Sequence, residues 1–241
     1  MEWSKFSPFF HESWHPKIKK WVESSDCDKL YTFLKEESRR GVLLAPLSNL
    51  TYRAFKETPL DECRAIVIGL CPYHTFLNGN ISVADGLALS CGITGKMQPS
   101  LKVLTDAWEK ELYDGLCLDC TKNPDLTYLA RDEKVLLINA ALTTPKDKAG
   151  AHVSKWEGFM EYLLSEVVGY TGIPTILLGK EAGKLSRYVT PFTHYWELTH
   201  PSYFARLNQE MDTNGVFKAV SNIVKQNNGV SINWLQKVED I

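Results

Sequence analysis

Short apolar runs separated by longer helical stretches make up the hydrophobic pattern of this chain. Three of these runs, 65–68, 135–138 and 175–178, are continuous rather than alternating, and each is followed at once by a glycine or a polar residue. Short continuous runs are typical of strands buried on both faces of a parallel sheet. A fourth strand is predicted over 195–198, where the chain runs into a threonine and a histidine.

Helical stretches fill the chain around these strands and are predicted over 28–37, 101–112, 154–168 and 215–226. Because strand and helix alternate, we expect an α/β fold: a three-layer sandwich with a central four-stranded, mainly parallel sheet flanked by helices. No repeat, low-complexity segment or long linker divides the chain. Residues 1–241 are therefore predicted to form a single domain.

The composition is that of a globular protein, with 44% hydrophobic and 23% charged residues. No apolar stretch approaches the ~20 residues that a membrane helix needs, and the first residues lack a basic region followed by an apolar one. We therefore expect a soluble, intracellular (cytoplasmic) protein, monomeric and without a membrane partner. The net charge of −2 does not indicate a nucleic-acid binder, so any DNA site must be a local basic patch.

Six cysteines are present, and they do not suggest a disulfide framework, because a core of this size needs no covalent links. We expect them to be reduced. Cys117 and Cys120 form a C-x-x-C pair that could bind zinc or an iron–sulfur cluster, but no second such pair completes a four-ligand site. Asp119 between them fits an acidic loop. Neither a metal nor another cofactor is therefore expected.

Residues with useful chemistry follow the predicted strands. The segment 71–74 comes after the first strand, Asn139 ends the second, Gly179 and Lys180 follow the third, and His200 follows the fourth. Ligands of open α/β sheets bind beyond the carboxyl ends of the strands, where several chain ends converge. These residues are therefore expected to share one site.

Residues 69–74 read GLCPYH and follow the first predicted strand. They resemble the water-activating loop of uracil-DNA glycosylases, which usually reads Gly-Gln-Asp-Pro-Tyr-His, and further motifs in the order of that family extend the resemblance over nearly the whole chain. Residues 86–90, GLALS, are similar to Gly-Leu-Ala-Phe-Ser, and residues 199–206, THPSYFAR, to the His-Pro-Ser motif. The remaining matches are QPSL at 98–101, the strand ending at Asn139 with the loop and helix start after it, and INW at 232–234.

This resemblance implies a hydrolase, a monofunctional DNA glycosylase that swings one nucleotide out of the helix and hydrolyses its N-glycosidic bond, leaving an abasic site. Asn139 would hydrogen-bond the Watson–Crick edge of the flipped base, and His200 the base oxygen on which negative charge develops. Tyr73, next to His74 in the base pocket, would abut carbon 5 of the base and reject the methyl group of thymine.

The resemblance also implies a set of DNA contacts. Ser100 and Ser202 would bind the phosphates that flank the flipped nucleotide, and Phe204 would take the position of the wedge side chain, usually Leu, that fills the vacated stack. Lys180 replaces a serine in the Gly-Ser phosphate loop of the family, where a lysine can still engage a phosphate. The other implied DNA-binding positions are Gly179, Tyr203 and Arg206.

Three departures from the family pattern fall in the base pocket: Leu70 replaces a glutamine, Cys71 the aspartate, and Leu89 the aromatic residue that stacks on the base. A thiol with a pKa near ~8.5 is mostly neutral at pH 7 and lacks the basicity and charge of a carboxylate. Losing such a charge typically costs ~10²-fold or more in rate. Asp85 could supply the missing carboxylate, since the segment 75–85 is about five residues longer than in typical members; a turn or helix cap is the other interpretation.

The other assignments also have structural interpretations. Asn139 could cap a loop after its strand, His200 could be a satisfied histidine ahead of a turn proline, and Phe204 could belong to the core. Their occurrence together in the order of the family favours the functional interpretation.

Three functions remain open at this point. The first is a glycosylase for a modified pyrimidine, such as a hypermodified phage cytosine excised in antiviral defence, because Leu70 and Leu89 change the size and polarity of the pocket. A substituent at carbon 5 would, however, require Tyr73 to be displaced. The second is a uracil-DNA glycosylase of base excision repair with a reduced rate. The third is a DNA-binding or replication-accessory protein without catalysis; retention of Asn139 and His200 favours an enzyme.

Overall fold

A four-stranded sheet forms the centre of the computed structural model, which describes residues 1–238. All neighbouring strands are parallel, in the spatial order β6-β2-β8-β9. The all-parallel order confirms the α/β sheet expected from the hydrophobic pattern. The strands are β2 (Ala65–Gly69), β6 (Val135–Asn139), β8 (Thr175–Leu178) and β9 (Tyr195–Leu198).

Burial explains why three of the four strands appear as continuous apolar runs. Every residue of β2, β6 and β8 is buried, as expected when both faces of a parallel sheet are covered. Strand β9 lies at one edge and is largely exposed, with Leu198 its one buried residue. Strand β6 lies at the other edge, but it contacts α3 and α5 and is buried throughout.

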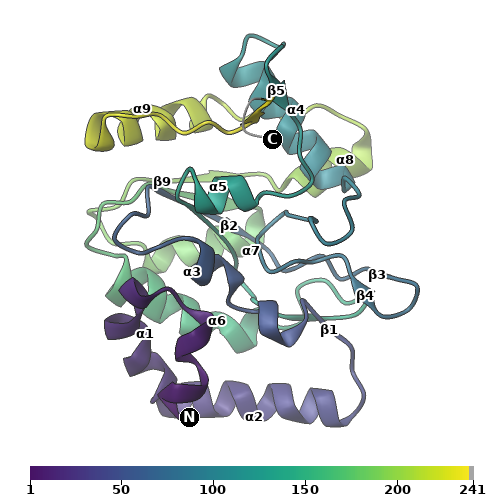
Figure 1. Ribbon diagram of the computed structural model, residues 1–241, viewed down its shortest axis with the longest axis vertical. Helices are drawn as coiled ribbons and strands as arrows, with labels where there is room; N and C mark the ends of the chain where they lie inside the picture. Colours follow the sequence, from purple (N-terminus) through teal and green to yellow (C-terminus); the bar gives the residue numbers. More distant parts are fainter. Residues whose placement is uncertain (239–241) are drawn as a thin grey trace.

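Helices cover both faces of the sheet (Figure 1), with α1, α2 and α6 on one side and α4 and α9 on the other. The four predicted helices are present with boundaries shifted by a few residues, except that the third is split into α6 and a π-helical turn at Leu163–Val167. Short helices were missed. The helices are α1 (His15–Val22), α2 (Ser25–Arg39), α3 (Arg53–Glu57), α4 (Pro99–Leu112), α5 (Thr127–Arg131), α6 (Val153–Tyr162), α7 (Lys180–Gly183), α8 (Pro201–Leu207) and α9 (Val216–Asn228).

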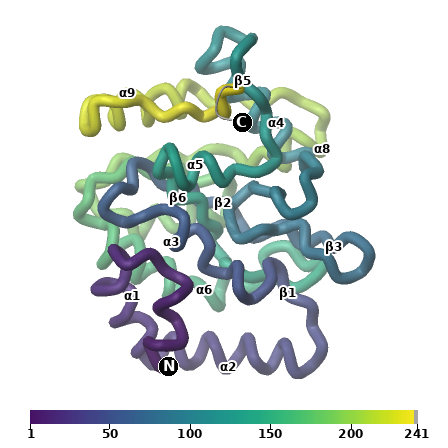
Figure 2. Tube along the Cα trace, viewed as in Figure 1, coloured from purple at the N-terminus to yellow at the C-terminus, as the bar shows by residue number. Residues whose placement is uncertain are grey.

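Three two-stranded antiparallel ribbons lie outside the central sheet, and two of them join segments that are distant in the sequence. Figure 2 shows the N-terminus beside α2, at the opposite end of the molecule from β5. The ribbons pair β1 (Leu44–Ala45) with β7 (Thr144–Pro145), β3 (Phe76–Leu77) with β4 (Ile81–Ser82), and β5 (Cys120–Thr121) with β10 (Gln236–Lys237).

The neighbouring strands β2 and β6 place the start of the 69–74 loop directly beside Asn139. In the parallel register Gly69 pairs with Asn139. The hydrogen bonding continues past the strand ends, because Ala140 N–H donates to the Gly69 carbonyl (2.9 Å) and Ala141 N–H to the Leu70 carbonyl (3.1 Å). The first residues of the loop are therefore held by the sheet itself.

One expectation about the cysteines is wrong. Cys117 and Cys120 form a disulfide, with their Cα atoms 5.4 Å apart, whereas Cys27, Cys63, Cys71 and Cys91 are free. The C-x-x-C pair lies in the loop that leads into β5, where a tight turn brings the two side chains together. Within residues 1–238, no helix is both long and apolar enough to cross a membrane.

Candidate active site

A small cavity opens at the carboxyl ends of the four parallel strands. Its volume is about 120 Å³, comparable with the ~150 Å³ of an engineered cavity that holds one benzene ring. The structure thus brings together residues from five separate motifs of the sequence, among them Asn139 and His200 from two strand ends, whereas Gly179 and Lys180 do not line the cavity. The lining residues are Leu70, Cys71, Pro72, Tyr73, His74, Leu89, Ser100, Asn139, Ala149, His200 and Ser202.

Asn139 is buried at the end of β6, and its amide lies against Gly69 on the neighbouring strand. A Cβ atom at position 69 would come within 2.6 Å of Asn139 Oδ1, so only glycine leaves room for this side chain. No hydrogen bond to the Asn139 amide comes from any residue in 1–238. Its donor and acceptor are therefore free to pair with a ligand in the cavity.

His200 precedes α8 and caps its first turn. Its Nδ1 accepts hydrogen bonds from the Ser202 backbone N–H (3.1 Å) and hydroxyl (2.9 Å), so the hydrogen of the neutral ring is placed on Nε2. Burial, with a smaller contribution from the nearby charge of Arg206, lowers the pKa of His200 to about 4. At neutral pH the ring is thus an uncharged Nε2–H donor.

Gly179 allows this histidine to approach the end of β8. Its φ is +92°, and a Cβ there would lie 2.8 Å from the Cβ of His200. Both facts exclude a larger residue at this position.

Tyr73 is fixed as one wall of the cavity. Its hydroxyl donates to the Leu89 carbonyl (3.0 Å) and also hydrogen-bonds the Ser100 hydroxyl (2.9 Å) in the first turn of α4. Burial raises the pKa of Tyr73, so the hydroxyl stays protonated. With both sides of the hydroxyl engaged, the ring cannot swing without breaking these hydrogen bonds.

Cys71 occupies the position of the acid in the 69–74 loop, and it is uncharged. Burial raises the pKa of its thiol, although a hydrogen bond from Gly150 N–H to Sγ (3.2 Å) opposes this shift. Leu70 lies beside it, with its methyl groups against Gly150. This part of the pocket is therefore apolar and holds no ionised base. Gly150 is far away in the sequence, in the matched loop that follows Asn139, and the sequence assigned it no role.

His74 ends the 69–74 loop. Its Nδ1 is buried and has no hydrogen-bond partner within residues 1–238. Its backbone carbonyl accepts from Asp147 N–H (3.0 Å), which connects this loop to the segment after β7.

The suggestion that Asp85 supplies the missing carboxylate is wrong. Asp85 is completely buried and is absent from the residues that line the cavity. Its oxygens accept hydrogen bonds from Leu87 N–H (3.1 Å), the Ser90 hydroxyl (2.6 Å) and Gly92 N–H (2.9 Å), and Oδ2 lies 3.2 Å from Nη1 of Arg53. With its lone pairs occupied, this carboxylate cannot activate a water molecule; the turn-cap interpretation describes it correctly.

The residues predicted to contact DNA differ in their exposure and in their relation to the cavity. Ser100 and Ser202 line the cavity, and Lys180 is exposed at the start of α7. On α8, Tyr203 is 47% exposed, whereas Phe204 is half-buried and packs against the core. Arg206, on the same helix, is exposed.

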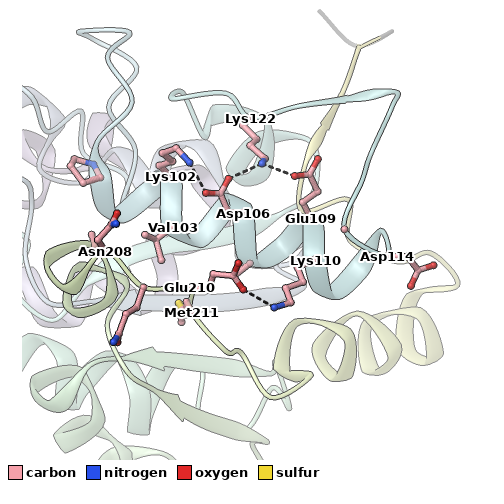
Figure 3. Close-up of a pocket in the computed structure, with 15 residues that line it drawn as sticks. Lys102, Val103, Asp106, Glu109, Lys110, Asp114, Lys122, Asn208, Glu210 and Met211 are labelled. Carbon is pink, nitrogen blue, oxygen red and sulfur yellow. Dashed lines mark hydrogen bonds and ion pairs between the residues drawn. The ribbon is translucent and has the colours of Figure 1, made fainter.

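A larger cavity of about 850 Å³ lies along α4, away from the strand ends. Its charged side chains are mostly paired with one another (Figure 3): Lys122 bridges Asp106 (2.7 Å) and Glu109 (2.6 Å), and Lys110 pairs with Glu210 (2.7 Å). Because these charges are already satisfied, the smaller cavity is the better candidate for chemistry.

Comparisons with known proteins find similar sequences and structures among uracil-DNA glycosylases. A scan against models of protein families finds no match. Similar curated proteins include the uracil-DNA glycosylases of Streptococcus mutans serotype c, 33% identical over 196 residues (80% of this chain, 84% of that protein), and Streptococcus pyogenes serotype M28, 30% identical over 230 residues (94% and 99%).

Solved structures share the fold. The crystal structure of mimivirus uracil-DNA glycosylase superposes with a TM-score of 0.83 at 18% identity, covering 95% of this chain and 88% of that one. A wild-type UNG from Nitratifractor salsuginis gives a TM-score of 0.65 at 18% identity, with 95% and 98% covered. Together with the sequence relatives, these matches show that the chain belongs to the uracil-DNA glycosylase family.

Proposed function

We propose that this protein excises uracil, or another pyrimidine without a bulky group on carbon 5, from DNA by a route that lacks the usual carboxylate. The observation that carries this proposal is the convergence of the Asn139 amide, the neutral His200 ring and the fixed Tyr73 ring on one base-sized cavity. A protein that only binds DNA has no need for a donor placed to stabilise a leaving group.

In this proposal Asn139 and His200 act on the departing base. The amide of Asn139 pairs with the Watson–Crick edge of the flipped base through its donor and its acceptor. As the glycosidic bond breaks, negative charge develops on the base, and the Nε2–H of His200 donates to the base oxygen. A neutral donor suits this role, because it is already oriented by the Ser202 contacts to Nδ1 and needs no proton transfer.

The attacking water receives little help in this pocket. Cys71 is a neutral thiol, and Asp85 is committed to its own loop. Loss of one preorganised charge costs ~10²-fold or more in rate. We therefore expect excision in which stabilisation of the leaving base carries most of the catalysis, with a rate below that of family members that retain the aspartate.

The identity of the base is argued from Tyr73. Its hydroxyl is held by Leu89 and Ser100, so the ring cannot easily make room for a substituent on carbon 5. This favours uracil over the hypermodified cytosine of the antiviral hypothesis. The apolar side formed by Leu70 and Cys71 is the observation that still supports a modified pyrimidine, and that substrate is kept as one arm of the test.

The DNA strand is proposed to lie across the mouth of the cavity. Ser100 and Ser202 bind the phosphates that flank the flipped nucleotide, and Lys180 at the start of α7 binds another. Aromatic side chains on α8 fill the vacated stack. Phe204 is the residue at the wedge position of the family, and Tyr203, with the more exposed ring, supports it.

The test uses oligonucleotides that contain uracil, thymine alone, or glucosyl-hydroxymethylcytosine, with abasic sites detected by alkaline cleavage. Cleavage of the uracil strand alone, at a rate well below that of a family member with the aspartate, is expected. Asn139→Ala and His200→Ala should each abolish it, whereas the matched surface changes Asn228→Ala and His194→Ala should not. Uracil excision at full family rates contradicts the altered chemistry. DNA binding without any product indicates the accessory protein instead.

A further inference from the structure

The segment Asp85–Gly92, called here the Asp85 loop, forms one side of the base cavity without containing any residue that reacts. Its contribution to the cavity is Leu89, whose side chain lines the pocket and whose carbonyl accepts the hydrogen bond of the Tyr73 hydroxyl (3.0 Å). The position of the Tyr73 ring therefore depends on where this loop holds one backbone carbonyl.

The backbone of the loop is strained at the same residue. Leu89 has a φ of +66°, a left-handed conformation that a residue with a branched side chain rarely adopts. Such a conformation persists only where surrounding contacts fix it. In this loop, the Asp85 carboxylate supplies contacts on both sides of Leu89.

Asp85 binds the loop at three points. Oδ1 accepts from Leu87 N–H (3.1 Å), and Oδ2 accepts from the Ser90 hydroxyl (2.6 Å) and from Gly92 N–H (2.9 Å). These donors lie on both sides of Leu89. Ser90 Oγ in turn accepts from Leu126 N–H (3.1 Å), so the loop is also tied to the chain before α5.

Arg53 fixes Asp85 relative to the rest of the fold. Its Nη1 lies 3.2 Å from both Asp85 Oδ2 and the Asp85 carbonyl oxygen, and its Nη2 donates to Thr127 Oγ1 (2.6 Å). Arg53 belongs to α3 and Thr127 to α5, so two helices hold the carboxylate in place. On the other side, Ala88 N–H donates to the Leu137 carbonyl of β6 (3.0 Å).

We infer that Asp85 is a positioning residue for base specificity: through the Asp85 loop it holds the Leu89 carbonyl, and thereby the Tyr73 ring, against the face of the cavity that excludes a group on carbon 5. This inference deepens the proposed function and rests on the pocket that it assigns. Asp85 touches no substrate; it acts through Leu89 and Tyr73.

The direct test replaces Asp85 by asparagine, which keeps the size of the side chain. An amide has only one acceptor oxygen. Its NH₂ group, which can only donate, must therefore face at least one of the N–H groups that now donate a hydrogen bond to the carboxylate. Asp85→Asn is therefore expected to speed hydrogen exchange at the amides of Leu87 and Gly92. It is also expected to lower the ratio of the dissociation constants for free thymine and free uracil by about 10-fold, within the ~10- to 200-fold range that a pocket obtains from one methyl group.

Titration with the free bases makes this test independent of hydrolysis. If the wild-type protein cleaves no DNA but prefers uracil to thymine, and Asp85→Asn removes that preference, the proposed function fails and the positioning role stands. Faster exchange of the two amides with an unchanged thymine:uracil ratio overturns the inference. Equal binding of the two bases by the wild-type protein overturns it as well.

Two further variants separate positioning from general stability. Ser90→Ala removes one of the three contacts and should shift the ratio in the same direction by a smaller factor, which keeps the test available if Asp85→Asn does not fold. Tyr128→Phe removes a buried hydrogen bond to the Trp234 carbonyl (2.6 Å), away from the cavity, and serves as the matched control. It should lower stability and leave the ratio unchanged; a shift as large as that of Asp85→Asn would overturn the inference.

Discussion

Adding one methyl group at Gly69, which does not itself line the cavity, should displace the Asn139 amide, which we propose pairs with the flipped base. The Cβ of Gly69→Ala would come 2.6 Å from Asn139 Oδ1, whereas ordinary contact distances begin at 3.4 Å. The amide must therefore retreat by about 0.8 Å, and a ~1 Å misplacement can cost ~10²-fold in rate. We expect kcat/KM on uracil-containing DNA to fall by about 10- to 10²-fold, which corresponds to ~1.4–2.7 kcal/mol.

A double-mutant cycle with Asn139→Ala checks the cause of this loss, and it is measured as the affinity for free uracil because excision is lost in the Asn139→Ala background. If the methyl group acts by displacing the amide, Gly69→Ala should cost almost nothing once Asn139 is already alanine. Gly158→Ala on α6 is the control, because its Cβ would meet the nearest atom, on Trp21, at an ordinary 3.7 Å. A Gly69→Ala protein with wild-type kcat/KM, or with the same loss in both backgrounds, would refute the reasoning.

Two other predictions follow from the charges in the pocket. Cys71→Asp should raise uracil excision by ~10²-fold by restoring a carboxylate, with Cys71→Ser as a control that stays slow; single-turnover rates that do not rise would contradict the substrate assignment. Because the pKa of His200 is lowered from 6.5 to about 4 in the folded protein, the unfolded chain takes up a proton on this ring at a higher pH than the folded protein does. The contribution of His200 to the free energy of unfolding is therefore fully present above pH 6.5 and is lost as the pH falls towards about 4. Urea midpoints at pH 7 and pH 5 should differ less in His200→Gln than in the wild type, and an equal difference would show that another group titrates.

The sequence was sufficient for the sheet and most of the pocket, because these depend on local patterns. Strands β2, β6 and β8 are fully buried and therefore appear as continuous apolar runs, and several site residues follow them at the strand ends. Short helices such as α3 and α5 escaped prediction, since five residues span little more than one turn and leave almost no periodicity to detect.

The roles of individual residues were less accessible when they depend on distant partners. From the sequence, Asp85 was compatible with both a catalytic carboxylate and a cap. Its structural role depends in part on the contact with Arg53, which lies on another element and is not visible in the local sequence. Gly150 donates to the thiol of Cys71 across a separation of 79 residues, and no local pattern announces such a contact. The size of the core led to the expectation of reduced cysteines, but the Cys117–Cys120 disulfide depends on the local turn that joins this pair.

The backbone ladder that continues from β2 and β6 into the 69–74 loop has an evolutionary consequence. Since the Gly69 and Leu70 carbonyls are held by Ala140 and Ala141, the main chain keeps its course whichever side chains occupy positions 70 and 71. Recognition of a base and activation of water can then diverge independently. If the proposed roles hold, substitution at two adjacent codons changes the hydrolytic step while Asn139 stays in register with Gly69.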